Sequence, residues 1–191
     1  MDTLSGGRSR LSQGITAVIF GLFSLIWFEW GQEAPPGWLK VWLDIGAAVA
    51  GLVGIAGAAV CFRNRSADVP VQDPAARRRQ GIIVGTEFAV AGLLAAVLGM
   101  TGNPTFIPVA IAGVVGVHFY SLAAPLNDPG LRPLSVLTCL VTIAGLITGL
   151  TSTVAPSAVV GPGVGILLTG YAALGLVTPP WYKPNRLTGK S

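Results

Sequence analysis

Six apolar stretches alternate with short breaks along the chain, and this alternation predicts six membrane-spanning helices. A helix that crosses the hydrocarbon needs about 20 apolar residues, and each stretch reaches or approaches that length. The predicted spans are residues 14–30, 38–62, 81–100, 107–126, 134–150 and 159–177. Pro and Gly in the breaks end helices, since Pro lacks an amide proton and clashes with the preceding turn. The pattern therefore predicts one all-α domain over residues 1–191, with residues 63–80 as its long loop.

Composition supports a membrane environment. Hydrophobic residues make up 52% of the chain and charged residues only 10%, whereas roughly a quarter of the residues in soluble domains are charged. A small globule has too much surface to hide such an excess of apolar side chains. The net charge of +4 does not by itself indicate nucleic-acid binding, because loops beside a membrane also collect basic residues.

The positions of the basic residues predict the orientation of the bundle. With six spans, one side receives all of them except Lys40. They are Arg8, Arg10, Arg63, Arg65, Arg77, Arg78, Arg79, Arg132, Lys183, Arg186 and Lys190. The positive-inside rule then places both termini and the loop 63–80 in the cytoplasm. The chain has more Arg than Lys, and it is rich in Ala, Gly and Val. Such a composition is typical of proteins from GC-rich bacteria. We therefore expect a bacterial inner membrane.

Two ionisable residues fall inside neighbouring spans. Glu87 is expected about 9 Å from the cytoplasmic end of its helix and His118 about 12 Å from that of the next, at 1.5 Å per residue. A charged side chain left alone at that depth costs at least about 2.5–3.5 kcal/mol. We therefore expect Glu87 and His118 to pair across the two helices, with Thr86 and Tyr120 as supporting groups.

Two interpretations of this pair remain open. In the first, the Glu87–His118 couple takes up and releases protons, as in proton-coupled transporters. In the second, the pair only holds two helices together.

Acidic and aromatic residues also gather around the first outer turn. Glu29 and Asp44 are expected near Trp30 and Trp42, and carboxylates beside aromatic faces can hold an organic cation. The alternative is a belt of interfacial aromatic residues with a salt bridge to Lys40.

Two further patterns, a group of arginines and rows of small residues, bear on lipid and protein partners. Arg63, Arg65, Arg77, Arg78 and Arg79 are expected to attract anionic lipid headgroups. Rows of small residues, such as Gly46, Ala50, Gly54 and Ala58, favour close helix packing within the bundle, with a homo-oligomer or a larger membrane complex as the alternative.

The chain lacks the common catalytic and cofactor motifs. It has no phosphate-binding glycine loop, no HExxH and no nucleophile elbow, and its two cysteines lack metal-ligand spacing. With a single histidine, haem ligation by two histidines of one chain is excluded. We therefore expect no metal and no cofactor, and nothing here favours an enzyme.

The segment GVHFYSLAAPLNDP, with GTEF in the preceding span, resembles small multi-pass bacterial membrane proteins. The resemblance covers the third and fourth spans and implies no activity, cofactor or partner. It includes Glu87 and His118. The leading functional hypothesis is a small transporter or permeation protein with a proton-linked Glu/His pair. The alternative is a non-catalytic structural or accessory subunit of a membrane complex.

Overall fold

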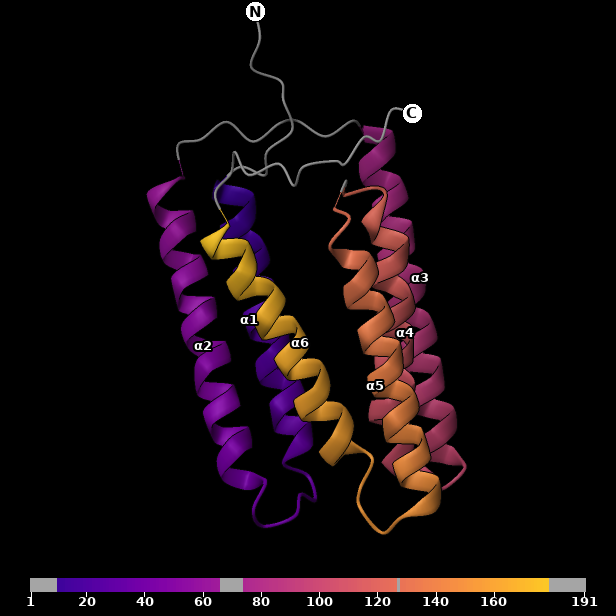
Figure 1. Ribbon diagram of the computed structural model, residues 1–191. Helices are drawn as coiled ribbons and strands as arrows, with labels where there is room; N and C mark the ends of the chain where they lie inside the picture. The colour runs from indigo at the N-terminus through magenta and orange to yellow at the C-terminus, as the bar shows by residue number, and fades with distance from the viewer. Residues whose placement is uncertain (1–9, 66–73, 127, 179–191) are drawn as a thin grey trace, which may run out of the picture.

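The computed structural model describes residues 10–65, 74–126 and 128–178, and within these ranges the chain is all-α (Figure 1). The elements are α1 (Arg10–Gly31), α2 (Lys40–Arg63), α3 (Pro74–Met100), the short 3-10 helix η1 (Pro104–Phe106), α4 (Ile107–Ala123), α5 (Leu131–Thr151) and α6 (Ser157–Val177). Six segments in these ranges are long and apolar enough to cross a membrane. The length and hydropathy of the helices therefore agree with the sequence pattern.

Four helix ends differ from the predicted bounds by three residues or more, and the first is the start of α1, at Arg10 rather than at 14. Helix α3 begins at Pro74, inside the segment expected as a loop, because Pro suits the first helical position and the Ala and Arg residues after it favour helix. Helix α4 ends at Ala123 rather than at 126, because Pro125 has no amide proton to continue the helical hydrogen bonds. Helix α5 begins at Leu131, with Pro133 in its first turn, where Pro is tolerated.

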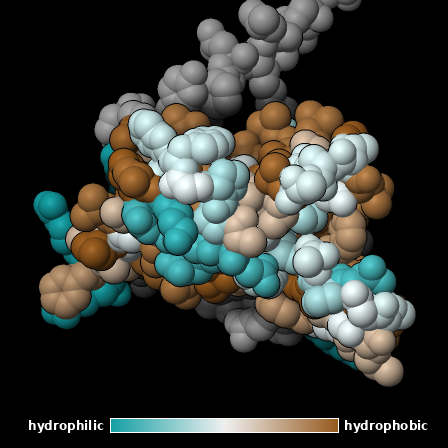
Figure 2. All heavy atoms as spheres, turned by 90° about the horizontal axis from the view of Figure 1, so that it is seen from below, coloured by the Kyte–Doolittle hydropathy of each residue, from teal (hydrophilic) through white to brown (hydrophobic). Residues whose placement is uncertain are grey.

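The start of α1 and the end of α6 lie side by side, at what we call the terminal end of the bundle (Figure 1). Arg10 Nη1 donates to the Leu176 carbonyl at 3.1 Å, and Gln13 Nε2 donates to the Thr178 carbonyl at 3.0 Å. These side chains satisfy carbonyls that the end of a helix leaves without intrahelical partners. The opposite, hairpin end carries the turns after α1, α3 and α5, and Figure 2 shows hydrophilic and near-neutral residues there beside hydrophobic ones.

Helices α1, α2 and α6 pack closely through small residues. A Cβ added to Gly21 of α1 would come within 2.8 Å of the Gly54 Cα of α2. A Cβ added to Gly161 of α6 would come within 2.6 Å of the Gly31 Cα of α1. Such contacts require residues without side chains, which is how membrane helices approach one another closely. The small-residue row of α2 is thus used partly within the bundle.

Helices α4 and α5 form a second closely packed pair. Ser135 Oγ donates to the Gly116 carbonyl at 2.6 Å, and both residues are buried. The main buried cluster joins this pair to α1 and α6. Its fully buried members are Trp27, Val109, Ala112, Phe119, Ala123, Leu131, Leu134, Val160, Val164 and Leu168.

Helix α3 lies at the edge of the bundle. It packs chiefly against α4 and η1, and no residue between Gln80 and Met100 is buried. The turn after α3 contains Gly102 at a φ of 76°, a conformation that glycine adopts readily. The chain thus holds α3 beside α4 without drawing it into the core.

Large apolar side chains cover the outer surface of all six helices. Examples that are more than half exposed, one per helix, are Leu22, Leu52, Leu93, Val117, Leu140 and Ile166. Exposed apolar surface of this extent is typical of contact with lipid or another protein rather than with water.

Candidate functional site

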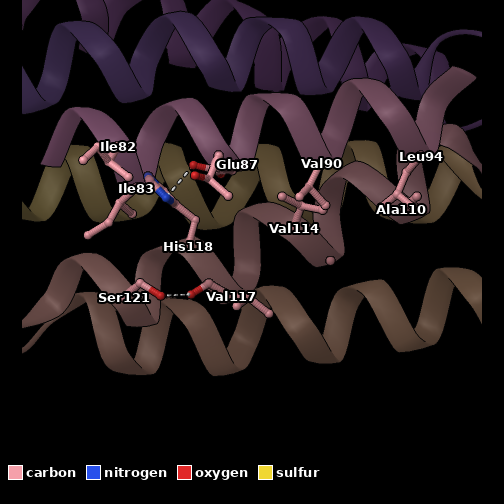
Figure 3. Close-up of a pocket in the computed structure, with 12 residues that line it drawn as sticks. Ile82, Ile83, Glu87, Val90, Leu94, Ala110, Val114, Val117, His118 and Ser121 are labelled. Carbon is pink, nitrogen blue, oxygen red and sulfur yellow. Dashed lines mark hydrogen bonds and ion pairs between the residues drawn. The ribbon is translucent and has the colours of Figure 1, made fainter. Parts of the chain in front are cut away.

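Glu87 and His118 meet across α3 and α4. His118 Nδ1 lies 2.5 Å from Glu87 Oε2, and the side chains are 13% and 15% exposed for His118 and Glu87 respectively. Figure 3 shows the two side chains pointing toward one another, between the backbones of the two helices. The rise per residue predicts nearly equal depths for the two groups. Because α3 and α4 are antiparallel neighbours, side chains at similar depth can meet.

The geometry of this contact indicates an ionic interaction. Nδ1 of His118 has no acceptor placed in line for a hydrogen bond, although the Glu87 oxygen is within hydrogen-bond distance. The two groups are within ion-pairing distance, and the contact is an ion pair when His118 is protonated.

The couple lies between two hollows. A cavity of about 1050 Å³ lies between α1 on one side and α3 and α4 on the other, with α6 at its back; we call it the α1–α3 cleft. A groove of about 750 Å³ follows the other side of the α3–α4 contact, and we call it the α3–α4 groove (Figure 3). Glu87 and His118 line both. Glu87 and His118 thus lie between the α1–α3 cleft and the α3–α4 groove, and they are not part of a close-packed core.

The lining of the α1–α3 cleft changes character along its length. At the terminal end and in the adjoining half, it includes polar side chains from four helices and from the connection before α5. These are Ser12, Thr16, Gln80, Glu87, His118, Asp128 and Tyr171. Toward the hairpin end, α1 contributes Phe23, Ile26, Trp27 and Trp30 instead. The polar side chains of the cleft therefore lie among apolar ones toward the terminal end, and the other end is apolar and aromatic.

Asp128 and Tyr171 form a second polar contact beside the first. The Tyr171 hydroxyl donates to Asp128 Oδ2, and the Gly130 amide donates to Asp128 Oδ1 at 3.1 Å. Asp128 is 7% exposed although it lies between α4 and α5 rather than within a helix. A buried carboxylate is stabilised by such donors. The acid is thus a fixed part of the cleft wall.

Sequence reasoning missed this second contact. Asp128 belongs to the break NDPG, which was assigned to turn chemistry, as Asp before Pro-Gly commonly is. Tyr171 is an ordinary aromatic residue in an apolar span. An acid immediately after a predicted span, with Arg132 four residues later, was the one available signal.

Aromatic rings line the cleft on the α1 side. Phe20 lies 5.6 Å from Phe119 and 5.4 Å from Tyr171 between ring centroids. Trp27 and Trp30 meet edge to face at 5.0 Å. Tilted and edge-to-face pairs are favourable arrangements, so these rings form an ordered wall.

The two expected supporting residues lie in different places. Thr86 lines the α3–α4 groove beside Glu87. Tyr120 is 63% exposed on the outer surface of α4 and lines neither the cleft nor the groove. The helical spacing of Tyr120 from His118 directs the two side chains apart.

The acidic and aromatic residues of the first hairpin are not gathered around one point. Asp44 Oδ1 accepts from Gln32 Nε2 at 2.6 Å, and Trp42 is 64% exposed on α2. Trp30 packs against Trp27 and lines the cleft, while Glu29 is exposed. Among the described rings, no contact joins Trp30 to Trp42.

The basic residues lie at the terminal end. Arg63 and Arg65 are exposed at and just after the end of α2, and the Arg65 guanidinium lies 4.7 Å from the Phe62 ring centroid. Arg77, Arg78 and Arg79 belong to the first turns of α3, where the Arg78 side chain is exposed; those of Arg77 and Arg79 are outside the described part.

In the described ranges, no three His, Cys, Asp or Glu side chains are placed to hold a metal ion together. Cys61 and Cys139 are not joined in a disulfide. Compared with known proteins, the chain matches no family model, no curated protein and no solved structure. The functional argument therefore depends on the cleft and the couple alone.

Proposed function

We propose that the chain spans a bacterial inner membrane six times, with both ends in the cytoplasm, and moves a small solute through the α1–α3 cleft. In this proposal the Glu87–His118 couple is the proton-binding group that controls access to the cleft. The observation that carries it is that an open cavity of about 1050 Å³ reaches the couple. A pair that served only to pin two helices would be expected in a close-packed interior.

The loose attachment of α3 supports the same proposal. Helix α3 contributes no buried residue from Gln80 to Met100 and packs chiefly on α4. Among the described residues, the couple is the polar side-chain contact between α3 and α4. Adding or removing a proton changes the strength of that interaction. Proton binding and the width of the cleft are therefore coupled in this proposal, as gating by a two-state element requires.

Cysteine accessibility tests this coupling without knowledge of the solute. In a Cys61→Ser, Cys139→Ser background, we expect Phe23→Cys in the cleft wall to react with a membrane-impermeant maleimide. The rate should differ at least about threefold between pH 5.5 and 8, the range in which histidine commonly titrates. Adding Glu87→Gln should abolish the difference.

Leu52→Cys is the matched control. It lies near mid-helix on α2, is 65% exposed on the outer surface, and does not line the cleft. Lipid should protect it from the reagent at every pH. If Phe23→Cys reacts no faster than Leu52→Cys at any pH, the cleft is not a water-accessible path and the proposed function is wrong.

The proposed topology has its own test. Reporter fusions after Asn103, in the turn between α3 and η1, and after residue 191 should report opposite sides of the membrane. The proposal requires the end of the chain to be cytoplasmic. Fusions that report the same side would rule out this arrangement.

A second candidate function is an accessory subunit that binds a larger membrane protein through α3. The observation that favours it is that Gly85, Gly92 and Gly99 of α3 have open space around them. Native mass spectrometry after mild extraction should then show a species above 19.6 kDa that Gly92→Leu reduces to the monomer. A monomer with pH-dependent Phe23→Cys labelling favours the transporter instead.

We further propose that the terminal end contacts anionic lipid headgroups through the five arginines Arg63, Arg65, Arg77, Arg78 and Arg79. Each basic side chain near a charged membrane surface contributes about 1 kcal/mol. Replacing Arg63 and Arg65 by Gln should lower the retention of anionic over zwitterionic lipid in native mass spectra. Equal retention of both lipids by the unmodified chain would contradict this.

A further inference from the structure

The charge of the cleft lining restricts what the cleft can bind. Its described lining includes the carboxyl groups of Glu87 and Asp128, and none of the described lining residues is Lys or Arg. An anionic solute would meet two carboxyl groups and, among the described lining residues, a single base, His118, which is unfavourable where little water is present. A cation would meet charge of the opposite sign.

The shape of the cleft restricts the ligand further. Along α1, its lining extends from Leu11 to Trp30, which is about 28 Å at 1.5 Å per residue. Its volume of about 1050 Å³ is at the upper end of the range for small-molecule sites. Since the polar groups occupy one end and Trp27 and Trp30 the other, a ligand that fills it has one polar part and a large apolar part.

The aromatic wall suits a cation as well as an apolar group. The faces and edges of Phe20, Phe119 and Tyr171 gather near the polar half of the cleft. Aromatic faces attract organic cations, and the attraction is stronger away from water. The same wall also buries the apolar body of such a molecule.

We infer that the α1–α3 cleft binds a hydrophobic organic cation, and that the cation and a proton compete for the Glu87 carboxylate. This inference rests on the proposed transport function and names its substrate class. When the cation lies against Glu87, the proton of the couple leaves for solution, so that the charge of the site is conserved. When the proton returns, His118 or the carboxyl group itself neutralises Glu87, and the cation is released.

The titratable groups that face the site come from three of the five helices that line it and from one connection. They are Glu87 on α3, His118 on α4, Asp128 before α5 and Tyr171 on α6; α1 contributes hydroxyl, apolar and indole groups to the wall. Asp128 already accepts from Tyr171 and Gly130. Glu87 and His118 are therefore the groups at which proton and cation exchange.

The test uses two probes of nearly equal shape and opposite charge, tetraphenylphosphonium and tetraphenylborate, with the full chain in zwitterionic lipid nanodiscs. Tritiated tetraphenylphosphonium should bind saturably, and its affinity should fall about tenfold from pH 8 to pH 5.5, as expected when a charge partner is lost. Tetraphenylborate should not compete beyond its general effect on the lipid. Tetraphenylborate that displaces the cation as an equal competitor would overturn the inference.

Variants test whether the cation binds in the α1–α3 cleft. Glu87→Gln should weaken cation binding at least about tenfold, and Glu33→Gln, an exposed acid outside the cleft, should leave it unchanged. Ile111→Trp keeps the carboxylate but fills part of the cleft, and should also reduce binding. Full affinity in both Glu87→Gln and Ile111→Trp would place the cation elsewhere and overturn the inference.

The two proposals fail in different ways. If Phe23→Cys labelling depends on pH but tetraphenylphosphonium does not bind, transport stands and the cationic substrate is wrong. If the cation binds with the same affinity at pH 5.5 and pH 8, the competition with a proton is wrong. If Phe23→Cys is protected while the cation binds, the cleft is a binding site and the transport function is wrong.

Discussion

Glycine has opposite roles in helices α1, α2 and α6 and in helix α3. In the first group, glycines such as Gly21 and Gly161 lie against the backbone of a neighbouring helix. On α3, Gly85, Gly92 and Gly99 have no neighbouring atom within 4 Å of an added Cβ. Close packing therefore fixes one part of the bundle, whereas one ionic contact is, among the described residues, the polar side-chain contact between α3 and α4. The cleft lies between these two regions.

The functional hypothesis concerns the loosely packed part of the bundle, which includes α3. Elements that move during function come from regions with few buried contacts, because moving them costs little packing energy. Helix α3 has no buried residue from Gln80 to Met100, yet it supplies Glu87. The well-packed helices supply the fixed wall against which such a movement would open or close the cleft.

The largest effect is expected where the packing is closest. Gly161→Val would force side-chain atoms into the Gly31 backbone, 2.6 Å from the added Cβ, and should lower the free energy of unfolding by about 3 kcal/mol. Gly92→Val on α3 is the matched control and should change it by less than about 0.5 kcal/mol. Thermal unfolding in the same detergent measures both. Equal losses would show that the two regions are equally well packed.

The next effect concerns the couple that holds α3. Glu87→Gln and His118→Gln should each lower stability by about 2 kcal/mol, because each leaves a mostly buried polar partner without its counterpart. The double variant should lose less than the sum, since the interaction is removed only once. Thr86→Val, beside Glu87 in the groove, controls for general changes in α3. Strict additivity would mean that the contact contributes nothing.

A smaller effect is expected at the second polar contact. Tyr171→Phe removes the hydroxyl that donates to Asp128 and should lower stability by about 1 kcal/mol, the usual net contribution of one hydrogen bond. Tyr120→Phe is the control, since Tyr120 is 63% exposed. Chemical unfolding of both variants against the unmodified chain measures the difference. The same loss in both would show a general effect of removing a tyrosine hydroxyl rather than an effect of the contact with Asp128.

The smallest effect is expected at the terminal end. Arg10→Gln shortens the side chain that donates to the Leu176 carbonyl and should lower stability by about 0.5 kcal/mol, because the contact is partly exposed. Hydrogen exchange of the last turn of α6 should rise while that of α5 is unchanged. Exchange that rises equally in both helices would show that Arg10 stabilises the whole bundle rather than this junction.

The sequence predicted the helices better than it predicted their ends. Hydropathy is a local property of the chain, so six apolar stretches led to six helices of suitable length. Helix α3 begins early, at Pro74, within a polar segment that was predicted as a loop. Pro and Arg both fit the first turns of a helix. Hydropathy cannot detect a helix that continues beyond its apolar part.

The sequence also located part of the candidate site. Glu87 and His118 were selected because charged groups are costly within an apolar span. The constant rise of a helix indicated that the two residues lie at nearly equal depths. Their juxtaposition needed only that consecutive helices be neighbours. Thr86 and Tyr120 were chosen by proximity in sequence, which does not say which way a helical side chain points, and only Thr86 lies beside the couple.

By itself, then, the sequence determined the number of helices, their apolar surface and the depth of the two ionisable groups, because each of these follows from residues close together in the chain. Only the tertiary structure decided that α3 stays at the edge, that Asp128 meets Tyr171 across 43 positions, and that a cleft separates α1 from α3. These features depend on which helix faces pack against one another. That choice is made by the fit of side chains far apart in sequence, which a one-dimensional pattern does not contain.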